Sequence, residues 1–160
     1  MVRIPPAPPT HADLRVAVVR SRFNEEVTAR LASGAVAAFR AAGIPAAQIF
    51  ELEVAGAIEL AFAADLAIRD LGVDAVACVG AVIRGDTDHY EHVCRIAGDA
   101  IARVALDRQV PVAFGVLTCD DEAQALARAG GAAGNKGTDA ARTALELALL
   151  ARATRAHGRS

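Results

Sequence analysis

The chain has 160 residues, of which 54% are hydrophobic and 22% are charged, and its formal net charge is −2. That length suits one domain with a core of its own, and the nearly balanced charge argues against a dedicated nucleic-acid binder, which would carry a basic stripe. Charged residues interrupt every apolar run before it reaches the roughly 18–20 residues of a membrane-spanning helix, so we expect no membrane segment.

The cysteines stand far apart, at Cys78, Cys94 and Cys119, and none belongs to a Cys-x-x-Cys pair. Their odd number and wide spacing predict neither a disulfide framework nor a zinc site, and they fit a reducing compartment. The N-terminus also lacks the apolar stretch of a secretory signal. We therefore expect a cytoplasmic protein.

The first 13 residues contain four prolines, at positions 5, 6, 8 and 9. Proline disfavours a helix interior, so this segment is predicted to be an extended arm. It is either a disordered tail or an arm that lies along a neighbouring subunit. Residues 14–160 show no internal repeat and no linker, and are expected to form a single domain.

From residue 15 onward, strand-like and helix-like apolar patterns alternate along the chain. Such alternation predicts an α/β fold with a parallel sheet and helices on both of its faces. The cap of the fourth helix is expected near Asp120, and Ile96 is expected to face inward from the third helix. We expect strands at 15–20, 49–54, 75–83 and 111–117, helices at 25–42, 57–71, 89–106, 121–129 and 138–155, and a glycine-rich loop at 130–137.

Ligands of open parallel sheets bind outside the carboxyl ends of the strands, so the turns that follow the strands are the first places to examine. In the turn after the first strand, Phe23 is a large aromatic residue among polar ones. It either folds back as a hydrophobic staple or offers a platform on which a planar heterocycle stacks. Asn24 is a candidate helix cap.

The turn after the second strand contains Gly56 and Glu59. Gly56 permits a ligand to approach the backbone closely, and Glu59 could accept hydrogen bonds from sugar-like hydroxyls. The alternative for Glu59 is that its charge only stabilises the first turn of the helix that follows.

The most informative turn follows the third strand and reads RGDTDH. Unpaired N–H groups at a helix start attract anions, so Thr87 and His89 there predict a phosphate site with a proton-transfer group beside it. The alternative is that Thr87 and Asp88 only cap the helix. Asp86 and Asp88 would repel a phosphate unless they point away from it. His92 makes a metal pair conceivable, but no third ligand has clear spacing, and no metal is expected.

Arg128 and Lys136, taken singly, would be solvated surface charges. The loop around Lys136 is not a nucleotide-binding P-loop, because it follows a helix and does not contain a contiguous Gly-Lys-Ser/Thr. Nor is it a dinucleotide-binding fingerprint, which belongs after the first strand.

Five segments taken together resemble the lumazine synthase family, over about residues 14–150. Each segment alone is a weak signal, whereas all five in this order are specific. The resemblance implies a three-layer α/β/α sandwich with a four-stranded parallel sheet in flavodoxin-like order, and an N-terminal arm that pairs with a neighbouring subunit. The segments are 22–24 (RFN), 56–59 (GAIE), 82–90 (VIRGDTDHY), 114–118 (FGVLT), and 128–130 (RAG) with 135–137 (NKG).

The resemblance also implies an enzyme of the transferase class that needs neither cofactor nor metal. Members condense 5-amino-6-(D-ribitylamino)uracil with 3,4-dihydroxy-2-butanone 4-phosphate and release phosphate, in the penultimate step of riboflavin biosynthesis. His89 would transfer protons, Arg128 would bind phosphate from an adjacent subunit, and Asp139 would be a charge partner of His89. The substrate-binding positions implied are Phe23 and Phe114 for the pyrimidine, Ala57, Ile58, Glu59 and Lys136 for the ribityl chain, Gly85, Asp86 and Thr87 for phosphate, and the adjoining Asn24, Gly56, Val82 and Ile83.

Members of the family form pentamers with active sites between neighbours, and some close twelve pentamers into a 60-subunit shell. The resemblance therefore implies a homo-oligomer that binds small-molecule substrates and no nucleic acid. The chain departs from the family's pattern at Ala55 and Ala61, where proline is usual, and at Asp86 and Asp88. These departures keep a second hypothesis open: a catalytically weak homologue that binds ligand or builds a shell. A flavodoxin-like flavin carrier is disfavoured, because the turn after the first strand is a poor phosphate loop.

Overall fold

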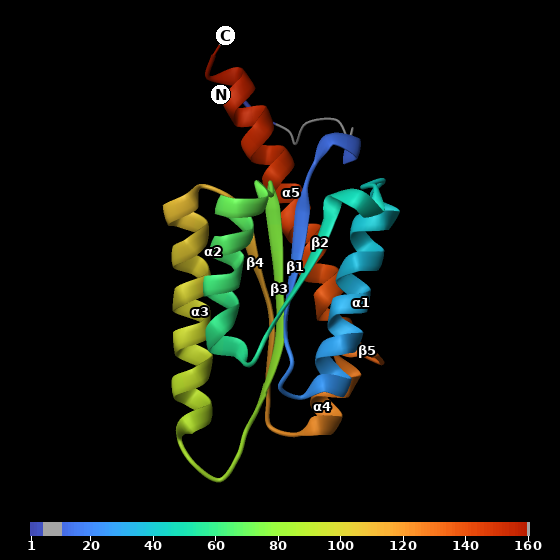
Figure 1. Ribbon diagram of the computed structural model, residues 1–160, viewed down its shortest axis with the longest axis vertical. Coiled ribbons are helices and arrows are strands. Elements are labelled where there is room, and N and C mark those ends of the chain that lie inside the picture. The colour runs from blue at the N-terminus through green and yellow to red at the C-terminus, as the bar shows by residue number, and fades with distance from the viewer. Residues whose placement is uncertain (5–10, 160) are drawn as a thin grey trace.

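A four-stranded parallel sheet forms the middle of the molecule, with helices on both sides (Figure 1). The computed structural model describes residues 1–4 and 11–159. The four prolines of the expected arm lie outside the described residues. Of the arm's described part, His11–Asp13 form a short 3-10 helix (η1), so the prediction of an extended chain is wrong for these three residues.

The sheet order is β2-β1-β3-β4, which confirms the predicted flavodoxin-like arrangement. Every neighbouring pair is parallel, and the register places Val16 of β1 beside both Ile49 of β2 and Ala75 of β3. Parallel pairing makes all four carboxyl ends meet at one edge of the sheet. The strands are β1 (Val16–Ser21), β2 (Ile49–Val54), β3 (Ala75–Ile83) and β4 (Val112–Cys119).

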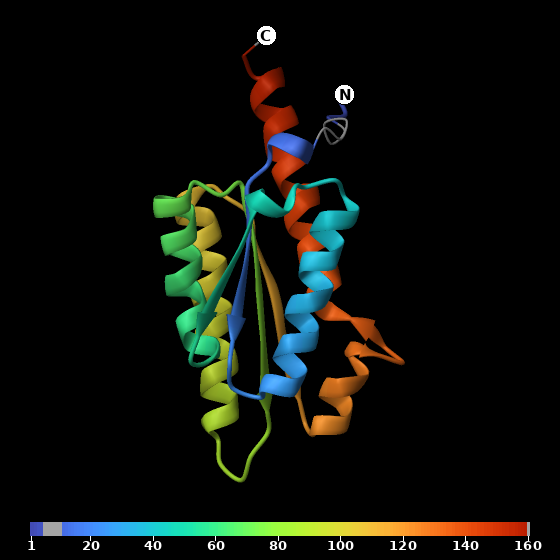
Figure 2. The same cartoon turned by 45° about the vertical axis from the view of Figure 1, so that its right-hand side comes forward.

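Two helices cover each face of the sheet (Figures 1 and 2). α1 (Glu25–Ala41) and α5 (Lys136–His157) pack on one face. α2 (Leu60–Leu71) and α3 (His89–Arg108) pack on the other, and α2 is preceded by the 3-10 turn η3 (Ala57–Glu59). This is the three-layer sandwich that the alternation of strands and helices predicts.

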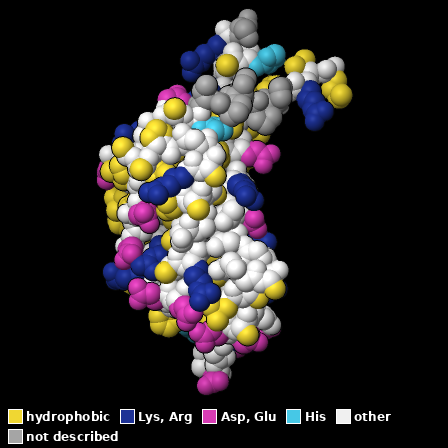
Figure 3. Space-filling view, turned by 90° about the vertical axis from the view of Figure 1, so that its right-hand side faces the viewer, with side chains coloured by type: hydrophobic (Ala, Val, Ile, Leu, Met, Phe, Trp, Pro, Cys, Tyr) yellow, Lys and Arg dark blue, Asp and Glu magenta, His cyan; other side chains and the backbone are white. Residues whose placement is uncertain are grey.

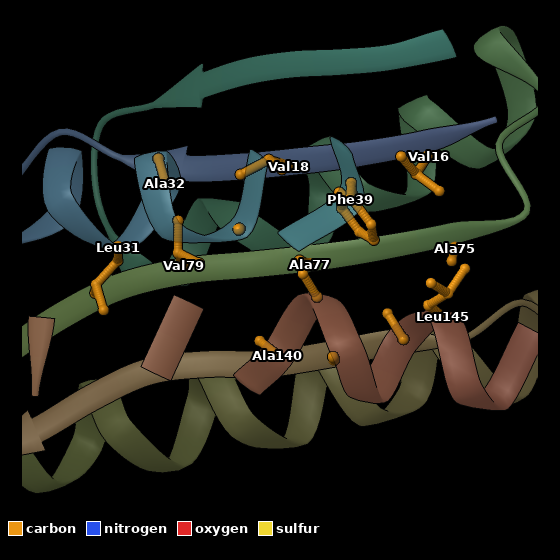
Figure 4. Packing of buried hydrophobic residues seen from close by; sticks show 14 of the residues in the cluster. Val16, Val18, Leu31, Ala32, Phe39, Ala75, Ala77, Val79, Ala140 and Leu145 are labelled. Carbon is orange, nitrogen blue, oxygen red and sulfur yellow. The ribbon is translucent and has the colours of Figure 1, made fainter. Parts of the chain in front are cut away.

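Alternate residues of each strand enter two separate hydrophobic cores. Val16 and Val18 of β1 face α1 and α5, whereas Ala17 and Val19 face α2 and α3. Figure 4 shows the first core, where Phe39 of α1 and residues of α5 meet the sheet. Burying a side chain such as Phe39 contributes about 1.5–3 kcal/mol, and both cores together fix the strand ends that carry the site.

Small residues let α5 approach its neighbours closely. A Cβ atom added to Gly137 would lie 1.9 Å from the carbonyl oxygen of Leu31 on α1. A Cβ on Gly115 of β4 would lie 2.9 Å from the Cβ of Ala140 on α5. No real contact is that short, so these helix and strand positions require glycine for close packing.

Some element boundaries differ from the prediction at the C-terminal third of the chain. α4 (Glu122–Ala127) is capped by Asp121, whose carboxylate accepts the Gln124 N–H at 2.8 Å, so the cap lies one residue after Asp120 and the helix is shorter than the predicted 121–129. The expected loop at 130–137 is mostly a small antiparallel hairpin, β5 (Ala129–Gly131) with β6 (Gly134–Asn135), and α5 begins at Lys136. Ile96 on α3 is 41% exposed, so its predicted inward orientation is also wrong.

Acidic and basic side chains are interspersed on the face of the molecule shown in Figure 3. Among the described residues, no helix combines the length and apolar character that a membrane span requires. The remaining short element, η2 (Ala46–Gln48), leads into β2.

Candidate active site

A cavity of about 360 Å³ lies at the carboxyl ends of the strands, beside the β3–α3 turn. Three of the four candidate turns contribute to it, because parallel pairing brings the ends of β1, β2 and β3 side by side. The turn after β3 extends past the other elements at this end of the molecule (Figures 1 and 2). The cavity is lined by Phe23, Gly56, Ala57, Ile58, Glu59, Ala81, Val82, Ile83, Gly85, Thr87, His89, Tyr90 and Val93.

Phe23 is 73% exposed and forms part of the cavity wall. It does not pack into the core, so the staple interpretation is wrong and the stacking platform remains. Two backbone hydrogen bonds hold its turn against the end of β2: Arg22 N–H to the Val54 carbonyl at 2.9 Å, and Phe23 N–H to the Ala55 carbonyl at 3.1 Å. An exposed aromatic ring on a fixed backbone suits stacking of a planar ligand.

Asn24 does not line the cavity and makes no side-chain cap to α1. Its backbone is left-handed, with φ of 60°, which asparagine tolerates better than most residues. The side-chain amide donates to the Ala81 carbonyl at 2.9 Å. Asn24 therefore ties the first turn to β3, and in this way it fixes the position of Phe23 next to it.

Glu59 is held over the second turn, where its Oε2 accepts the Gly56 N–H at 2.9 Å. This contact needs the extended backbone of Gly56, and a Cβ at that position would lie 3.0 Å from Oε2. The carboxylate is thus oriented at the cavity rim, where it can accept hydrogen bonds from ligand hydroxyls.

The central turn presents several backbone N–H groups at an exposed position. None of the hydrogen bonds that the structure describes uses the N–H of Gly85, Asp86, Thr87 or Asp88 as a donor. The His89 N–H points to Thr87 Oγ1 at 3.4 Å, and α3 begins at His89. Unpaired donors beside a helix N-terminus form an anion-binding site.

The acidic residues of this turn stay outside the cavity. Gly85, Thr87 and His89 line it, whereas Asp86 and Asp88 do not. The two carboxylates therefore do not share the cavity with an anion held by the turn. Their greater distance from that anion weakens the electrostatic repulsion between them and it.

A second group of expected site residues lies elsewhere on the chain. Phe114, Lys136 and Asp139 line a cavity of about 220 Å³ along β4 and α5. Phe114 is 46% exposed, and Lys136 Nζ lies 3.0 Å from Asp139 Oδ2. Arg128 follows α4 and donates to the Gln124 carbonyl at 3.1 Å. The expected site residues are thus divided between two surfaces of one chain, and Asp139 pairs with Lys136 rather than with His89.

Comparison with known proteins agrees with this geometry. Residues 13–152 match the family model described as 6,7-dimethyl-8-ribityllumazine synthase. The chain belongs to the lumazine synthase family.

Relatives with that printed name come from bacteria and a plant. The protein of Bdellovibrio bacteriovorus is 44% identical over 134 residues, which cover 84% of this chain and 73% of the relative. The protein of Coxiella burnetii (strain RSA 493 / Nine Mile phase I) is 42% identical over 141 residues, which cover 88% and 93%. The Arabidopsis thaliana protein, named as chloroplastic, is 44% identical over 137 residues, which cover 86% and 60%.

Sequence reasoning missed three residues of the cavity in this lumazine synthase family member. Ala81 and Val93 complete its apolar wall, and Tyr90 adds an aromatic ring. Val93 lies four positions after His89 on α3, so helical spacing alone could have placed it on the same face. Burial raises the pKa of the Tyr90 hydroxyl, which keeps it neutral and available as a hydrogen-bond donor.

The three free cysteines take no visible part in the cavity. Burial raises the pKa of the Cys78 thiol to about 12, so Cys78 stays a neutral core residue, as its apolar strand predicts. Burial also raises the pKa of Cys94 and Cys119. Within the described residues, no group of three or more His, Cys, Asp or Glu side chains is placed to hold a metal ion.

Proposed function

We propose that this chain is a 6,7-dimethyl-8-ribityllumazine synthase. It condenses 5-amino-6-(D-ribitylamino)uracil with 3,4-dihydroxy-2-butanone 4-phosphate and releases inorganic phosphate, as a transferase of riboflavin biosynthesis. The proposal depends on one observation: a single cavity is lined by the exposed ring of Phe23, the oriented carboxylate of Glu59, His89 and part of the turn 85–88 with its unpaired N–H groups. Family membership gives this combination its specific chemistry.

The reaction needs two substrates in one place, and it releases two waters and one phosphate. The 5-amino nitrogen attacks the ketone carbon, and water leaves as the imine forms. A proton then leaves the carbon next to the imine, a carbon–carbon double bond forms, and the C–O bond to phosphate breaks with its electron pair leaving on phosphate. Ring closure expels the second water. Holding both substrates in reactive geometry can lower such a barrier by about 7–11 kcal/mol, so binding supplies much of the catalysis.

The expected site residues in and beside the cavity have proposed tasks. Phe23 stacks on the pyrimidine, and Glu59 with residues 56–58 holds the ribityl hydroxyls. Gly85, Asp86 and Thr87 bind phosphate through the backbone of the turn and the Thr87 hydroxyl. His89 moves protons where amine and ketone condense, which contributes roughly 10²–10⁴-fold in typical acid–base catalysis. Asn24, Val82 and Ile83 complete the substrate-binding set.

The second group of residues is proposed to serve the cavity of a neighbouring subunit. Phe114 would close the pyrimidine pocket, Arg128 would bind the phosphate and stabilise its departure, and Lys136 would contact the ribityl chain. Asp139 would balance the charge of His89 across the subunit boundary. The separation of the two cavities on one chain supports this division, because neither group is complete alone.

We further propose a cytoplasmic homo-oligomer, built as a pentamer with the option of a 60-subunit shell. Residues 14–160 act as one domain, and residues 1–13 as an arm that lies on a neighbour's sheet edge. The exposed edge of β2 is available for such pairing in the single chain. The substrates are small molecules, without a nucleic-acid or membrane partner and without a cofactor or metal.

Mixing the two substrates with the purified chain tests the proposed activity. We expect the absorbance of the lumazine chromophore to rise, with one phosphate released for each lumazine formed. Tight binding of the pyrimidine without product would instead favour the catalytically weak, ligand-binding or shell-forming homologue. The departures at Ala55, Asp86 and Asp88 motivate that alternative, whereas relatives named as synthases support the enzyme.

A further inference from the structure

Arg84 contacts three elements that converge beside the phosphate turn. Its backbone N–H donates to the Cys119 carbonyl at the end of β4 at 2.9 Å. Its Nε donates to Asp120 Oδ1 at 3.1 Å, and its Nη1 lies 3.7 Å from Glu91 Oε1 in the first turn of α3. The Arg84 Cζ atom also lies 4.4 Å from the centroid of the Tyr90 ring.

Tyr90 lines the cavity, and Arg84 does not. The guanidinium thus stacks on a ring that forms part of the cavity wall, while Arg84 itself is not one of the lining residues. Stacking of Arg84 on Tyr90 restrains the ring, and the ion pair with Glu91 restrains the start of α3. The Arg84 side chain, at the start of the segment 84–88 between β3 and α3, therefore also restrains the residues that follow this segment.

The contact with Asp120 continues toward α4. The Asp120 N–H donates to Gln124 Oε1 at 3.1 Å, and the Gln124 carbonyl accepts from Arg128 Nη1 at 3.1 Å. Arg84, Asp120, Gln124 and Arg128 thus form a continuous series of contacts. It runs from the phosphate turn of one cavity to the arginine that is proposed to serve the neighbour's cavity.

We propose that Arg84 is a positioning residue for the butanone phosphate, acting through Asp120 and Tyr90 rather than by direct contact. The planar guanidinium holds the turn 85–88 against β4 and α4, so that the turn N–H groups keep the spacing a phosphate needs. A turn with four consecutive unpaired donors cannot fix its own geometry, because its donors are reserved for the ligand. This inference rests on the proposed function of the same cavity.

Steady-state kinetics of Arg84→Gln test the proposal, with Arg15→Gln as the matched control. Arg15 also stacks on an aromatic ring, at 4.8 Å from the Phe50 centroid, and lies at the opposite ends of the strands. We expect Arg84→Gln to raise the KM for the butanone phosphate by roughly three- to tenfold, the scale of coupling within one contact network. The KM for the pyrimidine, and the melting temperature, should stay as in Arg15→Gln, because exposed ion pairs contribute little to stability.

A double-variant cycle identifies the route. If Arg84 acts through Asp120, the double variant Arg84→Gln with Asp120→Asn should raise the KM for the butanone phosphate no more than Arg84→Gln does alone. Arg84→Lys should raise this KM less than Arg84→Gln. Equal changes in both KM values, or a phosphate KM like that of Arg15→Gln, would overturn the inference. A wild-type chain that forms no lumazine would instead contradict the proposed function, and this outcome is read before any variant is compared.

Discussion

His89 occupies the first position of α3, on the wall of the cavity and next to the turn of unpaired N–H groups. Its place is fixed by backbone, since α3 is anchored by packing of Ala97 and Ile101 in the core. A proton-transfer group at this point reaches an anion site on one side and the apolar cavity on the other. Its role in the proposed reaction is to move protons, not to bind.

Replacing His89 by alanine should slow turnover by about 100-fold, at the low end for acid–base catalysis, because positioning of the substrates is retained. The KM values should change little. Measurement of kcat by lumazine absorbance checks this, with His92→Ala as the control, since His92 lies on the same helix and does not line the cavity. Equal losses in both variants would remove His89 from the mechanism.

Arg128 is expected to affect binding more than turnover. Arg128→Ala should raise the KM for the butanone phosphate by about 10-fold or more, the value of a lost charge-assisted contact, while the pyrimidine KM stays near that of the wild type. Arg128→Lys should raise the phosphate KM less than Arg128→Ala, because lysine keeps the positive charge. An unchanged phosphate KM in Arg128→Ala would refute the phosphate assignment, and Arg103→Ala, an exposed arginine of α3, controls for loss of surface charge.

At the scale of elements, the close approach of α5 to α1 depends on Gly137. Gly137→Ala would place a Cβ 1.9 Å from the Leu31 carbonyl, so one helix must move. We expect a loss of about 1–3 kcal/mol or more in the free energy of unfolding, as for other overpacked sites, measured by urea titration. Gly158→Ala is the control, because its nearest contact is an ordinary 3.6 Å. Equal stability of the two variants would show that α5 does not need this contact.

An ionic contact between α2 and α3 gives the fold a defined response to acid. Hydrogen bonds from Arg108, and then from Arg69, lower the pKa of Asp65 below its ordinary value. A carboxyl with a lowered folded-state pKa stabilises the fold above its unfolded pKa of about 4, and this contribution disappears as the pH falls through the folded value.

Asp65→Asn should therefore be less stable than the wild type at pH 7, and the difference should begin to shrink near pH 4 and disappear as the pH falls through the lower, folded-state pKa of Asp65. Unfolding by urea at a series of pH values measures it. Asp107→Asn removes an exposed carboxylate of α3 and should leave the pH dependence unchanged. If Asp65→Asn kept the full acid dependence of the wild type, the Asp65 contact would not be its source.

The strands and most helices could be predicted from the sequence because their signals are local. The apolar run at 75–83 matches β3 at both ends, and the alternating pattern at 49–54 matches β2. The hairpin at β5 and β6 was missed, since its glycines at 130, 131 and 134 resemble a loop when their pairing partner is unknown. Ile96 has helical spacing typical of a core residue, yet α3 has no further layer to cover it in the single chain.

The candidate site was predictable in part. Gly56, Thr87 and His89 follow strands in sequence, and the parallel sheet brings such turns together. The exposure of Phe23 could not be predicted, because the sequence is equally compatible with a hydrophobic staple and with a stacking platform. The position of Asp86 and Asp88 outside the cavity could not be predicted either, because it depends on the backbone conformation of the turn. That Phe23 and Phe114 line different cavities could also not be predicted, because it depends on the tertiary structure.

At the scale of the whole molecule, the proposed site residues line two different cavities of one chain. A head-to-tail contact between copies places unlike surfaces together, and it closes into a ring when the rotation permits. Dilution to the monomer should therefore abolish turnover while the fold of each chain remains.

If the two groups of residues serve one site across a subunit boundary, as proposed, a defect in one chain can be repaired by another. In a mixture co-assembled from His89→Ala and Arg128→Ala chains, about a quarter of the boundaries in a head-to-tail ring would pair an intact His89 with an intact Arg128. At butanone phosphate concentrations well below the KM of Arg128→Ala, where both preparations are weakly active, the two should regain roughly that share of wild-type activity once they are unfolded and refolded together. Simple mixing without subunit exchange should give none. Genetic complementation between alleles of a single gene is therefore the expected consequence of the proposed division of the site between neighbouring chains.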